Sequence, residues 1–270
     1  FLILVLGWAP EWATMVLVAL MCAVGAWELL HAIGGEAGKS LMPLTVLVAA
    51  LVPVCVYLEL AVETAELTAL PRLPLTGLLG ALFVLVLFFL AIRRYDAQRA
   101  IPFSAVTDAI FAGLVFPLML SCLLRLRMVP FIGMLLVFCP LCISFGSDTF
   151  ALFAGMLFGK HKMAPRVSPK KTVEGAVGGL VGGVIGMGIM MFVGAWVIQD
   201  AFIGPREVLL FGLAGSVISQ LGDLSFSVIK REFGVKDYGK LLPGHGGVLD
   251  RFDSVTFVAP FAYLLAALLG

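Results

Sequence analysis

Residues 75–92, LTGLLGALFVLVLFFLAI, decide the fold of this 270-residue chain, because none of these 18 side chains is charged. An α-helix rises about 1.5 Å per residue, so the stretch would extend about 27 Å, close to the ~30 Å hydrocarbon core of a bilayer. Arg93 and Arg94 follow it directly, as is typical where a helix leaves the membrane. The stretch therefore predicts a transmembrane α-helix.

The rest of the chain has the same character. Hydrophobic residues make up 61% of it and charged residues 13%. A soluble domain has roughly twice that charged fraction, about 25%. The mean hydropathy is +1.09. A water-soluble surface cannot hide so much apolar side chain. This excludes a soluble enzyme, a nucleic-acid-binding domain and a disordered chain, and it leaves a polytopic membrane protein.

The predicted fold class is an all-α polytopic membrane protein, a bundle of about nine transmembrane helices with the first one partial. The complete spans are expected at Trp12–Ile33, Met42–Leu60, Leu75–Ile92, Phe103–Leu124, Pro130–Phe158, Gly175–Ile198, Val208–Ile229 and Ser254–Leu269. The run Phe1–Gly7 is too short to cross a bilayer and is interpreted as the end of a first span. We expect N-terminal transmembrane helices at residues 1–129 and a catalytic transmembrane region at residues 130–270.

Basic residues predict the orientation. This span count places 14 of the 18 Lys and Arg residues in loops on one side of the membrane. They are Lys39, Arg93, Arg94, Arg99, Lys160, Lys162, Arg166, Lys170, Lys171, Lys230, Arg231, Lys236, Lys240 and Arg251. Because Lys and Arg accumulate in cytoplasmic loops, this side is predicted to be the cytoplasm. The compact chain favours a bacterial inner membrane.

Closely spaced glycines mark the span that starts at residue 175. They are Gly175, Gly178, Gly179, Gly182, Gly183 and Gly186. Small residues four apart allow helix backbones to approach closely. Two interpretations stay open, internal packing within the bundle and the interface of a homodimer.

Two aspartates at membrane depth are candidate site residues. An ionisable side chain there costs several kcal/mol unless it is paired or hydrated. Asp148 follows Ser144 and Ser147, and Asp223 lies about 10 Å inside the cytoplasmic end of its predicted helix. Glu28 also lies near a cytoplasmic helix end, where hydration favours a structural role.

The predicted cytoplasmic loop 230–253 mixes acids, cations and a flexible turn. Pro243-Gly-His-Gly-Gly247 can bend sharply and expose backbone N–H groups to an anion. Asp250 and Asp253 are three residues apart at the start of the last helix and share a face. Carboxylates beside Lys and Arg are typical of a magnesium–polyphosphate site. The chain has no P-loop, so this would be a non-Walker nucleotide site; the alternative is a basic anchor containing a turn.

The loop 159–174 holds a second group of anion-binding residues. Ser168, Lys170, Lys171 and Thr172 lie next to a helix start that is expected near Thr172. Hydroxyls, cations and the N-terminus of a helix are all suited to binding phosphate. Alone, this group would also fit a basic anchor at the membrane surface. The presence of the loop 230–253 strengthens the anion-binding interpretation.

The run from Ser227 to Asp253 resembles the signature of the phosphatidate cytidylyltransferases (CDP-diacylglycerol synthases). That pattern is S-x-x-K-R, four residues, K-D, and later P-x-H-G-G-x-x-D-R-x-D. The chain matches every fixed position, namely Ser227, Lys230, Arg231, Lys236, Asp237, Pro243, His245, Gly246, Gly247, Asp250, Arg251 and Asp253. Residues 168–175 and the block that starts at Asp148 are also similar to this family. The resemblance is sharp over about residues 144–253.

The resemblance implies that CTP and phosphatidic acid react to give CDP-diacylglycerol and pyrophosphate, with Mg²⁺ as cofactor and room for a second metal ion. Asp223 and Asp250 are the expected metal ligands, with Asp148 and Asp253 as further candidates. Asp223, Asp250, Lys230 and Arg231 are the candidate catalytic residues. The candidate substrate-binding residues are Ser168, Lys170, Lys171, Thr172, Lys236, Asp237, His245, Gly246, Gly247 and Arg251.

Two other functions compete with this one. A CTP-dependent lipid or polyprenol kinase would transfer the γ-phosphate to a lipid alcohol and would need a general base for the hydroxyl. An ion or metabolite transporter could use Asp148 and Asp223 in its pathway. The transporter hypothesis leaves the His-Gly-Gly-x-x-Asp-Arg-x-Asp loop unexplained.

Overall fold

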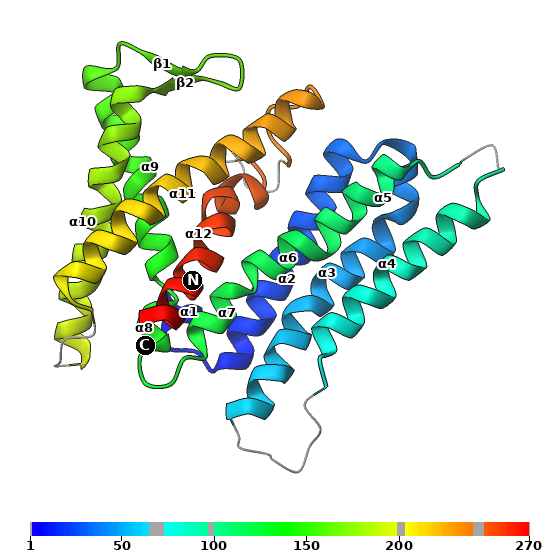
Figure 1. Ribbon diagram of the computed structural model, residues 1–270, viewed down its shortest axis with the longest axis horizontal. Helices are drawn as coiled ribbons and strands as arrows, with labels where there is room; N and C mark the ends of the chain where they lie inside the picture. The colour runs from blue at the N-terminus through cyan, green and yellow to red at the C-terminus, as the bar shows by residue number, and fades with distance from the viewer. Residues whose placement is uncertain (1, 65–72, 97–99, 199–202, 240–245, 270) are drawn as a thin grey trace. The chain divides into compact units, whose positions relative to one another are not determined.

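The computed structural model describes residues 2–64, 73–96, 100–198, 203–239 and 246–269, most of them helical (Figure 1). Eight helices in the described part are long and apolar enough to cross a bilayer. The short helix α1 (Leu2–Gly7) precedes them. The chain is therefore an all-α polytopic integral membrane protein, and the predicted number of complete spans is confirmed.

The helices form two compact units. Unit 1 comprises Phe1–Met128 and Val235–Arg251, and unit 2 comprises Val129–Gly234 and Phe252–Gly270. Part of the loop 230–253, called the signature loop below, thus packs with the N-terminal helices of unit 1. We expect the catalytic residues to lie at 130–270, apart from the helices at 1–129. The two units are defined by packing and not by function, so this division stays a prediction.

Unit 1 is built from three long helices and one span divided into shorter helical segments, which run side by side (Figure 1). In chain order these are α2 (Glu11–Ile33), α3 (Gly35–Thr64), α4 (Leu75–Arg93), α5 (Phe103–Ile110), η1 (Phe111–Val115), α6 (Phe116–Leu120) and α7 (Cys122–Arg127). Val48, Val52 and Val56 recur every fourth residue on α3 and pack in one buried cluster with Phe83 and Leu87 of α4. Residues four apart share a helix face, so this valine stripe forms the α3 side of the core.

The span predicted at Phe103–Leu124 is not one regular helix. It contains a π-helical turn, η1, directly before α6, which has Pro117 in its first turn. Proline has no N–H to donate, and its ring clashes with the carbonyl one turn back. Such turns inside helices absorb this irregularity. The hydropathy of the span does not reveal the break.

Unit 2 contains the remaining helices and the two-stranded sheet. In chain order these are α8 (Gly133–Leu136), α9 (Cys139–Phe158), β1 (Lys162–Ala164), β2 (Ser168–Thr172), α10 (Val173–Ile198), α11 (Pro205–Glu232) and most of α12 (Leu249–Leu269). The strands pair antiparallel, with Lys162 opposite Thr172 and Ala164 opposite Ser168. The segment predicted as a loop is therefore a β-hairpin between α9 and α10. Strands of three and five residues show too little alternation to be predicted.

The glycine face of α10 is covered within unit 2. A Cβ atom added at Gly182 would lie 2.6 Å from Phe150 Cβ on α9. One added at Gly183 would lie 2.8 Å from Gly212 O on α11. The glycines thus let α10 pack closely against both neighbours, which supports the internal-packing interpretation. A homodimer stays a prediction.

Candidate active site

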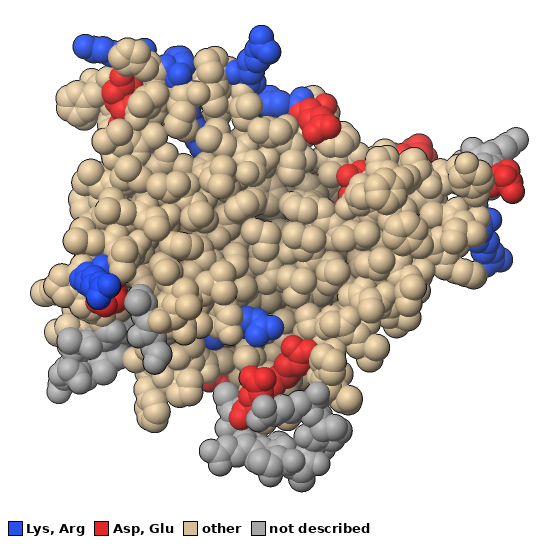
Figure 2. Space-filling view, in the orientation of Figure 1, with Lys and Arg blue, Asp and Glu red and all other residues tan. Residues whose placement is uncertain are grey.

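A cavity of about 520 Å³ lies in unit 2, lined by residues of α9, the hairpin, α10 and α11. Its polar walls are Asp148, Lys162, Lys170, Lys171, Thr172, Gln220 and Asp223. Figure 2 shows basic side chains standing over the hairpin, whereas the surface over α9 and α10 is mostly uncharged. The cavity therefore combines charge from the hairpin with the apolar surface of the helices.

Asp223 is the centre of the polar contacts in this cavity. Its Oδ2 atom lies 2.5 Å from Lys171 Nζ, which β2 supplies. Its Oδ1 atom accepts a 3.3 Å hydrogen bond from Ser227 Oγ, one turn further along α11. Both charged side chains are about a quarter exposed, so the pair is open to a ligand from the cavity.

Two more carboxylates of unit 2 lie near Asp223. Asp148 on α9 and Asp253 on α12 both interact electrostatically with it. Lys171 partly offsets the charge at Asp148, and Lys230 does so at Asp253. Unit 2 therefore gathers three of the four predicted metal ligands.

The residues present fit a magnesium ion. In the described part of the chain, no group of three or more His, Cys, Asp or Glu side chains is arranged to hold a metal. Mg²⁺, however, usually keeps several waters and needs only one or two carboxylates together with substrate phosphates. Asp148 and Asp223 line the same cavity and supply two such oxygen donors.

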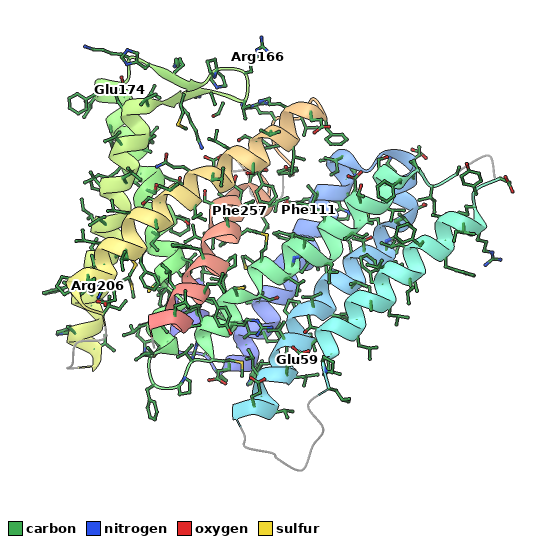
Figure 3. All side chains as sticks on the ribbon, viewed as in Figure 1. Glu59, Phe111, Arg166, Glu174, Arg206 and Phe257 are labelled. Carbon is green, nitrogen blue, oxygen red and sulfur yellow. The ribbon has the colours of Figure 1, made fainter. Side chains whose placement is uncertain are left out.

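The hairpin is fixed by side chains at its base and its turn. The Glu174 carboxylate accepts hydrogen bonds from the backbone of Lys160 (3.1 Å) and His161 (3.2 Å) and lies 2.6 Å from His161 Nδ1. Arg231 Nε donates to Val167 O at 3.0 Å. Arg231 is one of the predicted catalytic residues, and in this structure it also holds the hairpin turn. Figure 3 shows Arg166 and Glu174 at this end of unit 2 and Arg206 towards the other end.

The other predicted residues of loop 159–174 lie on β2. Thr172 Oγ1 accepts a 3.1 Å hydrogen bond from Gly175 N, which makes Thr172 the N-cap of α10. The helix start expected near Thr172 is confirmed. Lys170 is exposed and lines the cavity, and Ser168 begins β2.

Unit 1 holds the remaining predicted residues in the segment Val235–Arg251. Here Asp250 Oδ2 accepts hydrogen bonds from Tyr238 N (2.8 Å) and Gly247 N (3.0 Å). Gly246 adopts a φ of 81°, which favours glycine. The Asp250 carboxylate thus joins the two described parts of this segment. Three further candidates, Lys236, Asp237 and Arg251, are exposed. His245 lies outside the described residues.

Residues 1–269 match the model of a protein family described as "Cytidylyltransferase family". The chain belongs to this family. It is 34% identical over 253 residues to the phosphatidate cytidylyltransferase of Bacillus subtilis (strain 168), covering 84% of this chain and 90% of that protein. The protein of the same name from Rickettsia bellii (strain RML369-C) is 31% identical over 191 residues, which is 70% of this chain and 82% of the relative. The resemblance stated from the signature is confirmed.

Sequence reasoning about this cytidylyltransferase family member overlooked three side chains of unit 2. Lys162 of β1 lines the cavity but was counted only as a basic residue of its loop. Gln220 lines the cavity, and its Nε2 atom donates to Ala176 O at 3.0 Å. Its position three residues before Asp223 places both on one face of α11, and that spacing was a usable signal. Glu174 organises the base of the hairpin through backbone contacts, for which the sequence gives no comparable signal.

Proposed function

We propose that this chain transfers the cytidylyl group of CTP to phosphatidic acid, giving CDP-diacylglycerol and pyrophosphate in a bacterial inner membrane. The observation that carries the proposal is the unit 2 cavity, where Lys171 and Asp223 meet beside Asp148. The chain's family and the names of its relatives support the same reaction.

The lining of the cavity suits a lipid phosphate. Lys162, Lys170 and Lys171 offer three positive charges for phosphate oxygens. Leu152 and Met156 on the α9 wall are 60% and 72% exposed and can contact the start of the acyl chains. A polar wall opposite an apolar wall is what an amphipathic substrate requires.

The reaction needs charge neutralisation more than proton transfer. An oxygen of the lipid phosphate would attack the α-phosphorus of CTP, forming a new P–O bond while the bond to pyrophosphate breaks. The nucleophile is already an anion, so no strong general base is required. The obstacle is repulsion between anions, which the lysines and arginines of the two predicted loops would relieve.

Magnesium is the proposed cofactor. Asp223 and Asp148, which line the same cavity, would hold it, with Asp253 as a further candidate ligand of the same unit. A ligand role of Asp250 and a second ion stay predictions. When bound, the ion supplies positive charge to phosphate oxygens. The chain's own residues orient the carboxylates, as Ser227 does for Asp223.

The proposed site faces the cytoplasm, where CTP is made. The 14 basic residues of the more charged side include those of the hairpin and of the signature loop. Phosphatidic acid would then enter from the inner leaflet.

The test uses purified protein in detergent with phosphatidic acid, Mg²⁺ and CTP labelled at the α-phosphate. We expect label in the organic phase, and we expect EDTA to abolish it because the carboxylates would lose their ion. No lipid label from protein that still binds CTP would overturn the proposal.

Two further arms separate the competing functions. The lipid kinase predicts organic-phase label from γ-labelled CTP with a lipid alcohol and none from α-labelled CTP. The transporter predicts flux across vesicles without consumption of CTP.

A further inference from the structure

Glu28, near the C-terminal end of the apolar helix α2 of unit 1, contacts residues far along the chain. Its side chain on α2 is fully buried. Oε1 accepts a 3.0 Å hydrogen bond from Val248 N, and Oε2 accepts a 2.9 Å hydrogen bond from Leu249 N. These N–H groups stand at the start of α12, where no residue of the same helix can accept them. Glu28 therefore caps α12 from 220 residues away.

Two glycines of the signature loop leave room for this carboxylate. A Cβ atom added at Gly247 would lie 2.5 Å from both carboxylate oxygens of Glu28. One added at Gly239 would also collide with Oε1. The backbone approaches the carboxylate at both positions at a distance that only glycine permits.

A second carboxylate completes the arrangement. Asp250 accepts from Tyr238 N and Gly247 N, and it interacts electrostatically with Glu28. Two neighbouring acids are thus met by four backbone N–H groups. The N-terminal end of a helix also favours negative charge, which offsets the repulsion between the two acids.

We infer that Glu28 is a positioning residue for the segment Val235–Arg251. Through the backbone of Val248 and Leu249 it fixes where Gly246, Gly247 and Asp250 stand, without itself touching substrate. The inference rests on the proposed function, because these three residues are the ones expected to meet CTP and metal.

The decisive variant is Glu28→Gln. The glutamine keeps the shape and one acceptor but turns an amide N–H₂ group towards the other backbone N–H. Hydrogen–deuterium exchange at Val248 and Leu249 should therefore become faster. The KM for CTP should rise about tenfold or more, as expected for the loss of a charged hydrogen bond, while the KM for phosphatidic acid should stay unchanged.

Glu59→Gln is the matched control in the same unit. Glu59 on α3 accepts hydrogen bonds from Thr76 N (2.7 Å) and Thr76 Oγ1 (3.0 Å) near the start of α4, so it does for α4 what Glu28 does for α12. Its substitution should accelerate exchange at Thr76 and leave both KM values unchanged. A change of KM common to both variants would reflect general loosening of unit 1 and would overturn the inference.

The remaining outcomes also decide the matter. Unchanged exchange at Val248 and Leu249 in Glu28→Gln would show that Glu28 does not hold the loop. Faster exchange with unchanged kinetics would show that the contact does not matter for catalysis and would overturn the inference.

If Glu28→Gln does not fold, Gly239→Ala tests the same contact from the loop side, and an unchanged KM for CTP would overturn the inference. If the wild-type protein shows no cytidylyl transfer, the proposed function is overturned instead. Hydrogen–deuterium exchange at Val248 and Leu249 would then still show whether Glu28 holds the loop.

Discussion

At the residue scale, the pair of Lys171 and Asp223 links a cation from β2 to a carboxylate from α11. Asp223→Asn keeps the shape and the contact with Ser227 but removes the charge. We expect kcat/KM for CTP to fall on the order of 100-fold or more, because the proposed magnesium ion would lose a ligand and with it the positive charge that stabilises the phosphoryl transition state. Labelled product measures it, with Ser225→Ala as control because that hydroxyl donates to Leu221 O on the same helix. Equal activities of the two variants would contradict the role of Asp223.

At the element scale, the structure predicts which glycines α10 cannot lose. Gly182→Ala would push a methyl group into Phe150 of α9, whereas a Cβ atom at Gly188 has nothing within 4 Å. Overpacking of this kind typically costs about 1–3 kcal/mol. We therefore expect Gly182→Ala to lower the melting temperature of the detergent-purified protein and Gly188→Ala to leave it unchanged. Equal melting temperatures would contradict the packing of α10 on α9.

At the scale of the whole molecule, the orientation can be tested at the two ends of unit 2. Arg166 on the hairpin and Arg206 at the start of α11 are exposed and separated by the single span α10. In a background without the five natural cysteines, Arg206→Cys should react with an impermeant thiol reagent in intact cells. Arg166→Cys should react only after the membrane is opened. The reverse pattern would overturn the cytoplasmic site, and labelling of both from one side would contradict the span count.

Much of the fold could be predicted from the sequence because a bilayer imposes a local rule. Each span needs about 20 apolar residues, and hydropathy therefore located all eight complete helices. The same rule could not locate the π-helical turn before Pro117 or the short strands that carry Lys170 and Lys171. These features depend on individual backbone hydrogen bonds and leave the mean hydropathy unchanged.

The sequence by itself determined the membrane class, the family and the two segments expected to carry the chemistry, since spacing within a short motif survives without three-dimensional information. Only the tertiary structure showed that Asp223 faces Lys171 at 2.5 Å and that Glu28 caps α12. Sequence reasoning favoured a merely structural role for Glu28 at a hydrated helix end, whereas the folded chain buries it completely against the signature loop. The partners of that carboxylate lie 220 residues away, and no local pattern encodes a contact that is made only when distant segments of the chain pack together.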